Sequence, residues 1–271
     1  MKNMKKLGAT LLALTLTLSL AACGQKEEPT PDAPAADSDV AYIQGKGTLV
    51  IGMTDFAPMD YKNDTGEWIG FDADMGKAFA ESLGVDVEFI EINWDNKAME
   101  LEAKAIDAVW NGMTLTEEVT SLLGTSNAYC NNGQVVVVPA DKADKYQTEE
   151  SLAGLKFAVE NGSAGAEVLD GLSLPYTAMQ TQANALMEVA SGASDACVID
   201  LLMAGAMIGE GTSYPDLTYT VQLNSEEYGV GFRKGSDVVD AFNTFWKTAY
   251  DAGTVTEVAT TYGVQESIIP Q

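Results

Sequence analysis

Short apolar runs alternate with amphipathic segments along most of this 271-residue chain. Apolar and β-branched runs predict strands at 48–52, 85–92, 107–113, 134–139, 156–160, 175–179, 195–199 and 228–234. Apolar positions three or four residues apart predict helices between them, at 74–83, 96–104, 163–171, 183–191, 200–209, 237–250 and 255–262. Strands that alternate with helices are typical of parallel sheets with helices on both faces, so we expect an α/β fold.

Two of these segments also indicate where the core lies. The valine run 134–139 has the composition expected of a strand that is covered on both faces. The segment 237–250 places Phe242 and Trp246 on one face, which predicts a long amphipathic helix. Trp110, inside a predicted strand, is interpreted as a core residue, with a place in the wall of a pocket as the alternative.

The first 22 residues have the pattern of a secretory signal peptide. A start with three lysines is followed by an uncharged run, 7–20, that is too short to span a bilayer. Residues 20–23 read Leu-Ala-Ala-Cys, which resembles the lipobox of bacterial lipoproteins. The resemblance implies cleavage before Cys23 and a lipid anchor on that cysteine.

Residues 23–45 are predicted to form the lipidated cysteine and a flexible tether. The segment is rich in Pro, Ala, Asp and Glu and has no hydrophobic periodicity, which is typical of an extended linker. We therefore expect the folded part to begin at residue 46. We expect the protein to lie on the outer, extracytoplasmic face of the cell membrane.

Charge and residue usage narrow the classes of function. The chain has 40 acidic and 15 basic residues, for a net charge of −25, which disfavours nucleic acid as a partner. It has no histidine, the commonest general base and metal ligand. Because there is also no phosphate-binding glycine loop and no metal-ligand cluster, we expect no cofactor and no metal site.

Cys130 and Cys197 are the two cysteines besides Cys23. Cys197 lies in the apolar run 196–199 and is interpreted as a buried core thiol. Two cysteines do not form a disulfide framework, but a bridge between them stays open.

Six motifs resemble, in order and spacing, those of the family-3 extracellular solute-binding proteins, the receptors of polar amino-acid ABC importers. The resemblance covers residues 46–265. The motifs are GTLVIG at 47–52, AP at 57–58, GFDAD at 70–74, IDA at 106–108 leading to NGMT at 111–114, GASDA at 192–196 leading to Asp200, and YGVGFRKG at 228–235.

The resemblance implies a two-lobed fold of the type II periplasmic-binding-protein kind. Each lobe would hold a mostly parallel sheet flanked by helices, and two crossing strands would form the hinge. Lobe 1 would comprise residues 46–132 and 227–271, and lobe 2 residues 133–226. A small amino acid or amine would bind between the lobes, and an ABC permease in the membrane would recognise the closed form.

The family's ligand contacts in lobe 1 carry over to five positions. Phe56 and Trp94 would form aromatic walls, although each is also compatible with a core position. Asn111, Gly112 and Thr114 would hydrogen-bond the amino and carboxylate groups of the ligand.

The contacts in lobe 2 carry over in the same way. Gly162 and Ser163 would present backbone N–H groups at the start of a helix to the ligand. Asp200 would receive the ligand's ammonium group, with a role as the cap of the following helix as the alternative. Together, Asp55, Glu160 and Asp200 would favour a cation.

One feature of the family is absent. An arginine that forks onto the α-carboxylate usually follows the threonine of the NGMT motif by five residues, and here that position holds Val119. Arg233, the only arginine of the chain, belongs to the last motif. The carboxylate would then be held by Thr114, Ser163 and backbone N–H groups, Lys97 would replace the arginine, or the ligand would lack an α-carboxylate.

These observations predict the substrate-binding component of an ABC importer for a small polar ligand with an amine, and not an enzyme. A cleft enzyme remains an alternative, because some proteins that resemble this family are dehydratases. A ligand-sensing receptor subunit is a further alternative, but it would need a membrane-spanning or signalling segment after the fold, and the chain reaches Gln271 without one.

Overall fold

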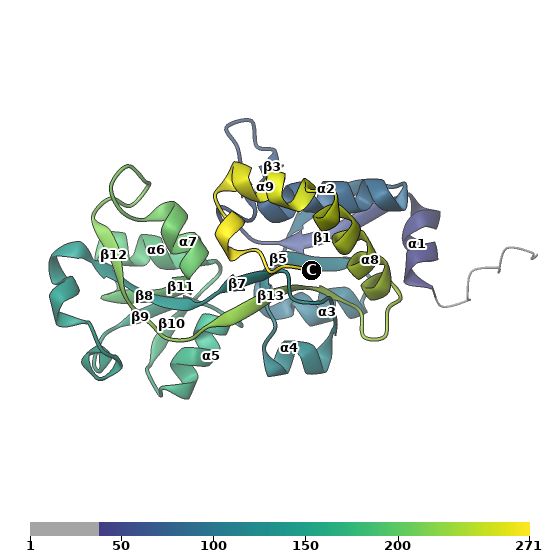
Figure 1. Ribbon diagram of the computed structural model, residues 1–271. Helices are drawn as coiled ribbons and strands as arrows, with labels where there is room; N and C mark the ends of the chain where they lie inside the picture. The colour runs from purple at the N-terminus through teal and green to yellow at the C-terminus, as the bar shows by residue number, and fades with distance from the viewer. Residues whose placement is uncertain (1–37) are drawn as a thin grey trace, which may run out of the picture. The chain divides into compact units, whose positions relative to one another are not determined.

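A computed structural model describes residues 38–271 (Figure 1). The predicted signal peptide, Cys23 and the first part of the predicted tether lie outside the described residues. The described chain forms two large sheets, each with its own helices, and a small two-stranded one, and we call the parts built on the large sheets lobe 1 and lobe 2. The predicted two-lobed α/β architecture is therefore observed. No helix within residues 38–271 is long and apolar enough to cross a membrane.

Lobe 1 is built on a sheet of strand order β4-β1-β5-β13-β6, in which β7 also pairs with β13. Its strands are β1 (Thr48–Met53), β4 (Asp86–Glu91), β5 (Ala108–Thr114), β6 (Gly124–Thr125), β7 (Cys130–Asn132) and β13 (Glu226–Phe232), beside a separate hairpin of β2 (Tyr61–Lys62) and β3 (Trp68–Ile69). Its helices are α1 (Asp39–Lys46), α2 (Phe71–Leu83), the 3-10 helix η1 (Trp94–Asn96), α3 (Lys97–Glu102), α4 (Glu117–Leu122), α8 (Val238–Asp251), α9 (Thr254–Tyr262) and the 3-10 helix η4 (Gln265–Ser267).

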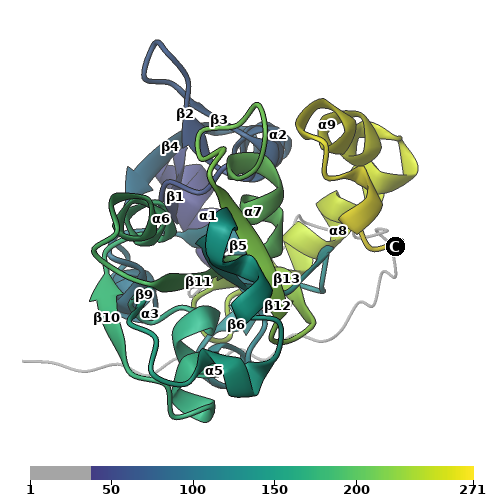
Figure 2. The same ribbon diagram turned by 90° about the vertical axis from the view of Figure 1, so that its left-hand side faces the viewer.

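Lobe 2 is built on a sheet of strand order β10-β9-β11-β8-β12. Helices cover both faces of this sheet, with α6 and α7 on one face and α5 on the other (Figures 1 and 2). The strands are β8 (Gln134–Pro139), β9 (Phe157–Glu160), β10 (Tyr176–Met179), β11 (Ala196–Asp200) and β12 (Leu217–Gln222). The helices are η2 (Ala140–Lys145), η3 (Glu149–Leu152), α5 (Ala164–Gly171), α6 (Gln182–Ser191) and α7 (Leu201–Met207).

Both large sheets contain parallel and antiparallel strand pairs. The direction of a strand depends on the side from which the chain enters the lobe. The strands joined by helices run parallel, namely β4, β1 and β5 in lobe 1 and β10, β9 and β11 in lobe 2. Strands β13 and β8 run antiparallel to these neighbours. The chain enters each lobe along such a strand from the side where the lobes meet, whereas the parallel strands end on that side.

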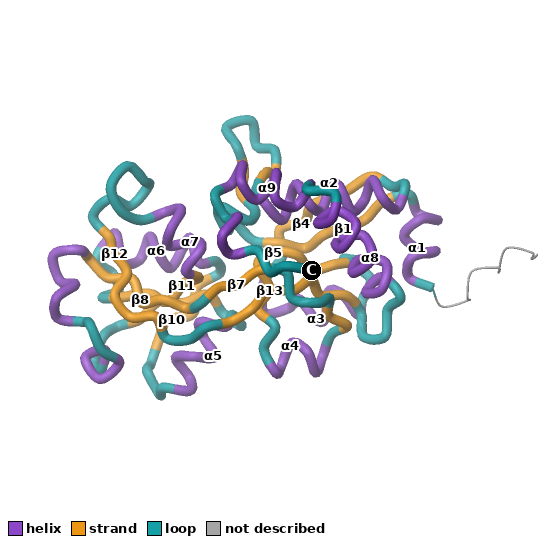
Figure 3. The backbone as a smooth tube through the Cα atoms, in the orientation of Figure 1, coloured by secondary structure: helices purple, strands orange, loops and turns teal. Residues whose placement is uncertain are grey.

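The chain passes between the lobes twice. The first crossing runs from β7 into β8 through Gly133, and the second runs from β12 into β13 through residues 223–225. The crossings lie side by side, because β7 pairs with β13 and β8 pairs with β12 (Figure 3). A pair of extended crossings of this kind forms a two-stranded hinge.

The structure corrects the predicted tether at its end, because residues 39–46 form the helix α1. The side chain of Ser38 caps this helix by accepting a hydrogen bond from the backbone N–H of Ala41 at 3.0 Å. The helix is fastened to lobe 1 by a 3.0 Å ion pair between Asp39 and Arg233 and by the buried side chain of Ile43. The folded part therefore begins about seven residues earlier than the composition of the segment indicates.

The core of lobe 1 is rich in aromatic side chains. Trp110 is 1% exposed and its ring lies 4.9 Å from that of Phe242, so its interpretation as a core residue is confirmed. Tyr129 is also fully buried, and its ring lies 4.9 Å from that of Trp246. Cys130 and Cys197 are buried free thiols, so the disulfide that the sequence left open is not formed.

Candidate functional site

The two lobes meet at the carboxyl ends of their parallel strands. In lobe 1 these are the ends of β1 and β5, and in lobe 2 the ends of β9 and β11. Side chains that follow such ends converge at one edge of a sheet, which is where open α/β sheets bind ligands.

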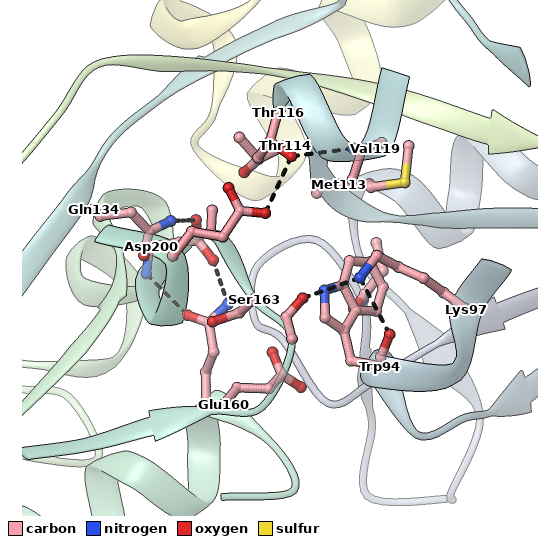
Figure 4. A pocket seen from close by; sticks show the side chains of 16 residues that line it. Trp94, Lys97, Met113, Thr114, Thr116, Val119, Gln134, Glu160, Ser163 and Asp200 are labelled. Atoms are coloured by element: carbon pink, nitrogen blue, oxygen red, sulfur yellow. Dashed lines mark hydrogen bonds between the residues drawn. The ribbon is translucent and has the colours of Figure 1, made fainter. Parts of the chain in front are cut away.

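A narrow cavity lies at this junction (Figure 4), and a wider pocket of about 280 Å³ adjoins it between the same lobes and shares Lys97, Val119 and Gly162 with it. The volume of the narrow cavity is about 20 Å³, which is room for about one water molecule. Residues of both lobes line it: Trp94, Lys97, Asn111, Gly112, Met113, Thr114, Thr116, Val119, Gln134, Glu160, Gly162, Ser163, Ala164, Glu167, Gln182 and Asp200. Within residues 38–271, no group of three or more metal-ligating side chains is arranged to hold a metal ion.

Seven of the nine predicted site residues line the cavity: Trp94, Asn111, Gly112, Thr114, Gly162, Ser163 and Asp200. Phe56 and Asp55 do not. The backbone N–H of Phe56 donates to the carbonyl of Asp60 at 2.7 Å, and this tight turn directs the Phe56 ring into the core, where it lies 6.4 Å from the ring of Tyr228. Asp55 is exposed to solvent, outside the lining.

Asn111 and Gly112 line the cavity, but their polar groups are already committed. The Asn111 amide donates to the Thr54 carbonyl at 3.0 Å and to Asp60 at 2.7 Å, and its oxygen accepts two bonds from Thr54. The backbone N–H of Gly112 donates to Asp72 at 2.7 Å. These two residues therefore shape the wall, and neither has the free donor that the sequence interpretation assigned to it.

Asp200 is the last residue of β11 and stands at the N-cap position of α7, and its side chain belongs to the cavity lining. It makes no side-chain hydrogen bond to the first turn of α7, so the cap alternative is wrong. Its carboxylate accepts hydrogen bonds from the side-chain amides of Asn132, Gln134 at 2.6 Å, and Gln182. Burial, and then the Glu226 carboxylate, raise the pKa of Asp200.

Glu160 is the last residue of β9 and is 2% exposed. Its Oε1 atom has no hydrogen-bond partner among the described residues. Burial, and then the nearby Asp200 carboxylate, raise the pKa of Glu160 to about 8, while the Lys97 ammonium opposes this shift. The lobe 2 wall therefore holds two buried carboxyl groups with spare accepting capacity, which suits a cationic group of a ligand.

Lys97, at the start of α3, forms the opposite wall. Its ammonium nitrogen lies 5.1 Å from the centre of the Trp94 ring and donates to the Trp94 carbonyl at 3.3 Å. It also donates across the cleft to the Gly162 carbonyl of lobe 2 at 3.0 Å. Figure 4 shows Lys97 and Trp94 on the side of the cavity away from Asp200 and Gln134.

A second bond across the cleft joins Thr116 of lobe 1 to Glu167 of lobe 2, at 3.2 Å. The two lobes are therefore closed against each other in this structure.

Several lining residues have no counterpart in the residues predicted from the sequence. Gln134 and Gln182 donate to Asp200, and Glu167 faces lobe 1. Glu226 lies just behind the wall, where it accepts a bond from Thr114 at 2.9 Å and shares the Asn132 and Gln134 amides with Asp200. No local signal marks the two glutamines, because only the topology brings the start of α6 and the crossing strand β8 to the end of β11.

Comparisons with known proteins agree with this architecture. Residues 49–265 match the bacterial extracellular solute-binding proteins, family 3. The chain is 29% identical to the arginine-binding extracellular protein ArtP of Bacillus subtilis, over 92% of this chain and 94% of that protein. It is 27% identical to a probable histidine-binding protein of Neisseria gonorrhoeae, over 97% of each chain.

Solved structures show the same similarity. A mutant of ArgBP from T. maritima is 29% identical with a TM-score of 0.77, over 82% of this chain and 98% of that chain. A substrate-binding protein of an ABC uptake transporter from Streptococcus pneumoniae, with bound histidine, is 27% identical with a TM-score of 0.76, over 84% of this chain and 97% of that chain. Since the family match spans most of the folded chain, the protein belongs to the bacterial extracellular solute-binding proteins, family 3.

Proposed function

We propose that this protein is the extracytoplasmic substrate-binding component of an ABC importer, and that it binds an amino acid or a close relative with a free amine. The ligand's ammonium would lie against Asp200 and Glu160. The observation that carries the proposal is the buried Oε1 of Glu160, which has no hydrogen-bond partner within residues 38–271, in a side chain close enough to Asp200 for their charges to repel. An ammonium group would satisfy both carboxylates and supply the compensating charge that a buried acid lacks.

Hinge closure is the mechanism that this geometry supports. A cavity of about 20 Å³ has no room for an amino acid, so a ligand would enter only when the lobes move apart. The two crossings are the short segments that would bend. A ligand bound to both walls would stabilise the closed form, because it contacts both walls only in that form.

Attachment to the membrane is part of the proposal. A lipid on Cys23 would keep the receptor close to a separate permease in the same membrane, and the 15 residues from Cys23 to residue 37 would give it reach. Metabolic labelling with a radioactive fatty acid tests this. Label should appear on the wild-type chain and be absent from Cys23→Ala, while a labelled variant would contradict the anchor.

A screen of amino acids and amines by isothermal titration calorimetry tests the ligand class. We expect binding by at least one compound with a free amine, and none by anionic compounds that lack one. Binding limited to anions without an amine would contradict the proposal.

Catalysis in the cleft is a second candidate. The chain is 30% identical, with a TM-score of 0.76, to an ancestral amino acid-binding protein described as a precursor of cyclohexadienyl dehydratase, over 83% of this chain and 99% of that chain. In addition, the pKa of Glu160, near 8, suits a general acid at neutral pH. Incubation of the protein with each ligand that binds, followed by mass analysis, distinguishes the two: recovery of unchanged ligand supports binding alone.

A further inference from the structure

The proposed function accounts for the amine end of the ligand and leaves the other end open. Lobe 2 supplies the carboxylates Asp200 and Glu160. In lobe 1, Val119 occupies the position where the sequence pattern of the family has a carboxylate-binding arginine, and it lies in the cavity lining with an apolar side chain. Among the residues that line the cavity, Lys97 is the only one with a cationic side chain.

Lys97 differs from the other partly buried lysines in how its charge is compensated. Within residues 38–271, the side chains of Lys46, Lys77 and Lys97 are partly buried, and Lys46 forms an ion pair with Asp107. Lys77 forms an ion pair with Asp74 at 2.9 Å. Lys97 forms no ion pair with any described residue, and its ammonium donates to two neutral carbonyl oxygens, those of Trp94 and Gly162.

This arrangement leaves Lys97 able to accept an anionic partner. An ammonium group has three N–H donors, so one remains after the two carbonyl bonds. A carboxylate is a stronger acceptor than a carbonyl, because the hydrogen bond then joins two opposite charges. Burial lowers the pKa of Lys97, and the acids around it, Glu160, Glu118, Asp95 and Glu167, act in the opposite direction.

The position of Lys97 also fits a zwitterionic ligand. Its ammonium projects from α3 of lobe 1, whereas Asp200 and Glu160 belong to lobe 2, and Figure 4 shows these groups on different sides of the cavity. A molecule with an ammonium at one end and a carboxylate at the other would therefore bridge the lobes. In the closed structure the same ammonium bridges them through the Gly162 carbonyl.

We propose that Lys97 binds the carboxylate of the ligand, in place of the arginine that Val119 replaces, and that it makes the site selective for amino acids over the corresponding amines and amides. When ligand binds, the carboxylate would accept a hydrogen bond from the remaining N–H of the Lys97 ammonium. This inference rests on the proposed function, because it assigns the second end of the same ligand.

The test compares each common L-amino acid with its α-carboxamide, on the full purified chain, by isothermal titration calorimetry. The two compounds of a pair carry the same amine and differ in the carboxylate. The wild type should bind the amino acid at least about tenfold more tightly than the amide, since a hydrogen bond from an ammonium to a carboxylate is stronger than one to a neutral amide oxygen. Lys97→Met should reduce that preference to about threefold or less, and Lys97→Arg should retain most of it.

Lys77→Met is the matched control, because it removes a partly buried lysine of the same lobe that lies outside the cavity lining. It should leave the preference unchanged. A preference that survives in Lys97→Met, or a wild type that binds the amide more tightly, would overturn the role of Lys97 while the proposed function stands. Absence of binding by every pair would overturn the proposed function itself, and this inference with it.

Discussion

Each lobe buries a pair of acidic side chains near the cleft, and the two pairs differ in what their oxygen atoms face. In lobe 1 the pair is Asp60 and Asp72, which are 0% and 1% exposed. In lobe 2 it is Glu160 and Asp200, which are 2% and 4% exposed. The lobe 1 pair lies outside the cavity lining, whereas both members of the lobe 2 pair belong to it.

The lobe 1 pair is built into the scaffold. Asp72 accepts bonds from the Gly112 N–H at 2.7 Å and from the Tyr129 hydroxyl at 2.8 Å, and Asp60 accepts from Asn111 at 2.7 Å. These bonds hold the strand end that forms one wall of the cavity. Gly112 adopts a φ of 55° there, and an added Cβ would lie 2.5 Å from the Phe56 ring.

Burial and a raised pKa are therefore poor guides to the binding site in this protein. Burial is the largest cause of the raised pKa in both pairs, which reaches about 7 for Asp72 and about 8 for Glu160. Each pair also contains one oxygen without a hydrogen-bond partner among the described residues. Contact with the cavity distinguishes the pairs.

The largest expected effect is on ligand affinity. Asp200→Asn should weaken binding of an amine-bearing ligand about 100-fold, because it removes the charge of a buried ion pair. Asp72→Asn should change affinity by less than about threefold, since Asp72 lies behind the wall. Calorimetric titration of both variants checks the contrast, and equal losses would show that the two pairs are not functionally different.

The pH dependence of ligand affinity should distinguish the two acidic pairs in a second way. An ammonium ligand favours ionised Glu160 and Asp200, so affinity should rise about tenfold from about pH 6 to pH 8 as their protons are displaced. Glu160→Gln should flatten this rise. Titrations in two buffers of different ionisation enthalpy would detect the proton release, and a pH-independent affinity would contradict the role of this pair.

The stability of the ligand-free protein should change with pH in the opposite direction to ligand affinity. The folded-state pKa values of Asp72 and Glu160 are raised above those of the unfolded chain, so the folded state binds more protons between about pH 4 and pH 8. The free energy of unfolding should therefore fall as pH rises through this window, and both pairs contribute to that fall. Thermal unfolding across the window tests the sign.

A smaller effect is expected from Gly162, where the lobes touch. An added Cβ there would lie 2.7 Å from the Asp95 carboxylate oxygen and 2.9 Å from its Cα atom, across the cleft. Gly162→Ala should hinder closure and weaken binding about fivefold, or about 1 kcal/mol. Gly154→Ala is the control, because Gly154 also has a positive φ but no atom within 4 Å of an added Cβ. Small-angle scattering would show whether only Gly162→Ala shifts the protein toward an open form.

The smallest effect is a loss of stability without loss of function. Asp72→Asn keeps one acceptor for the two donors that Asp72 serves, so the free energy of unfolding should fall by about 1 kcal/mol. Chemical denaturation measures this change. An unchanged stability would indicate that the lobe 1 pair does not support the wall.

The alternating strands and helices were predictable, because residues that face the core recur along the sequence with the period of a strand or a helix. The valine run 134–139 is strand β8 over the predicted residues, and Gly84 ends α2 in the left-handed conformation expected of a C-cap glycine. Strand β12 and helix α4 were missed. Strand β12 lies at the edge of its sheet with alternating exposure, and α4 is a single short helix that starts at the cap Thr116.

The sequence predicted which residues line the cavity better than it predicted which hydrogen bonds they make. Asp200 and Ser163 were carried over from the resemblance to the family, and both line the cavity, Asp200 at the end of β11 and Ser163 shortly after the end of β9. The bonds that occupy Asn111 and Gly112 come from Thr54, Asp60 and Asp72, which are 40 to 57 residues away along the chain. Pairings of that separation are set by the packing of whole elements, so no local pattern could show that these donors were already used.

Mass spectrometry of the small molecule that copurifies with the undenatured protein is the most direct test of the cleft. A closed receptor with two buried carboxylates should carry a molecule that contains a free amine, and Asp200→Asn purified in parallel should carry little or none of it. An anionic molecule without an amine, or equal occupancy in the variant, would contradict the assignment of this cleft to an amine-bearing ligand.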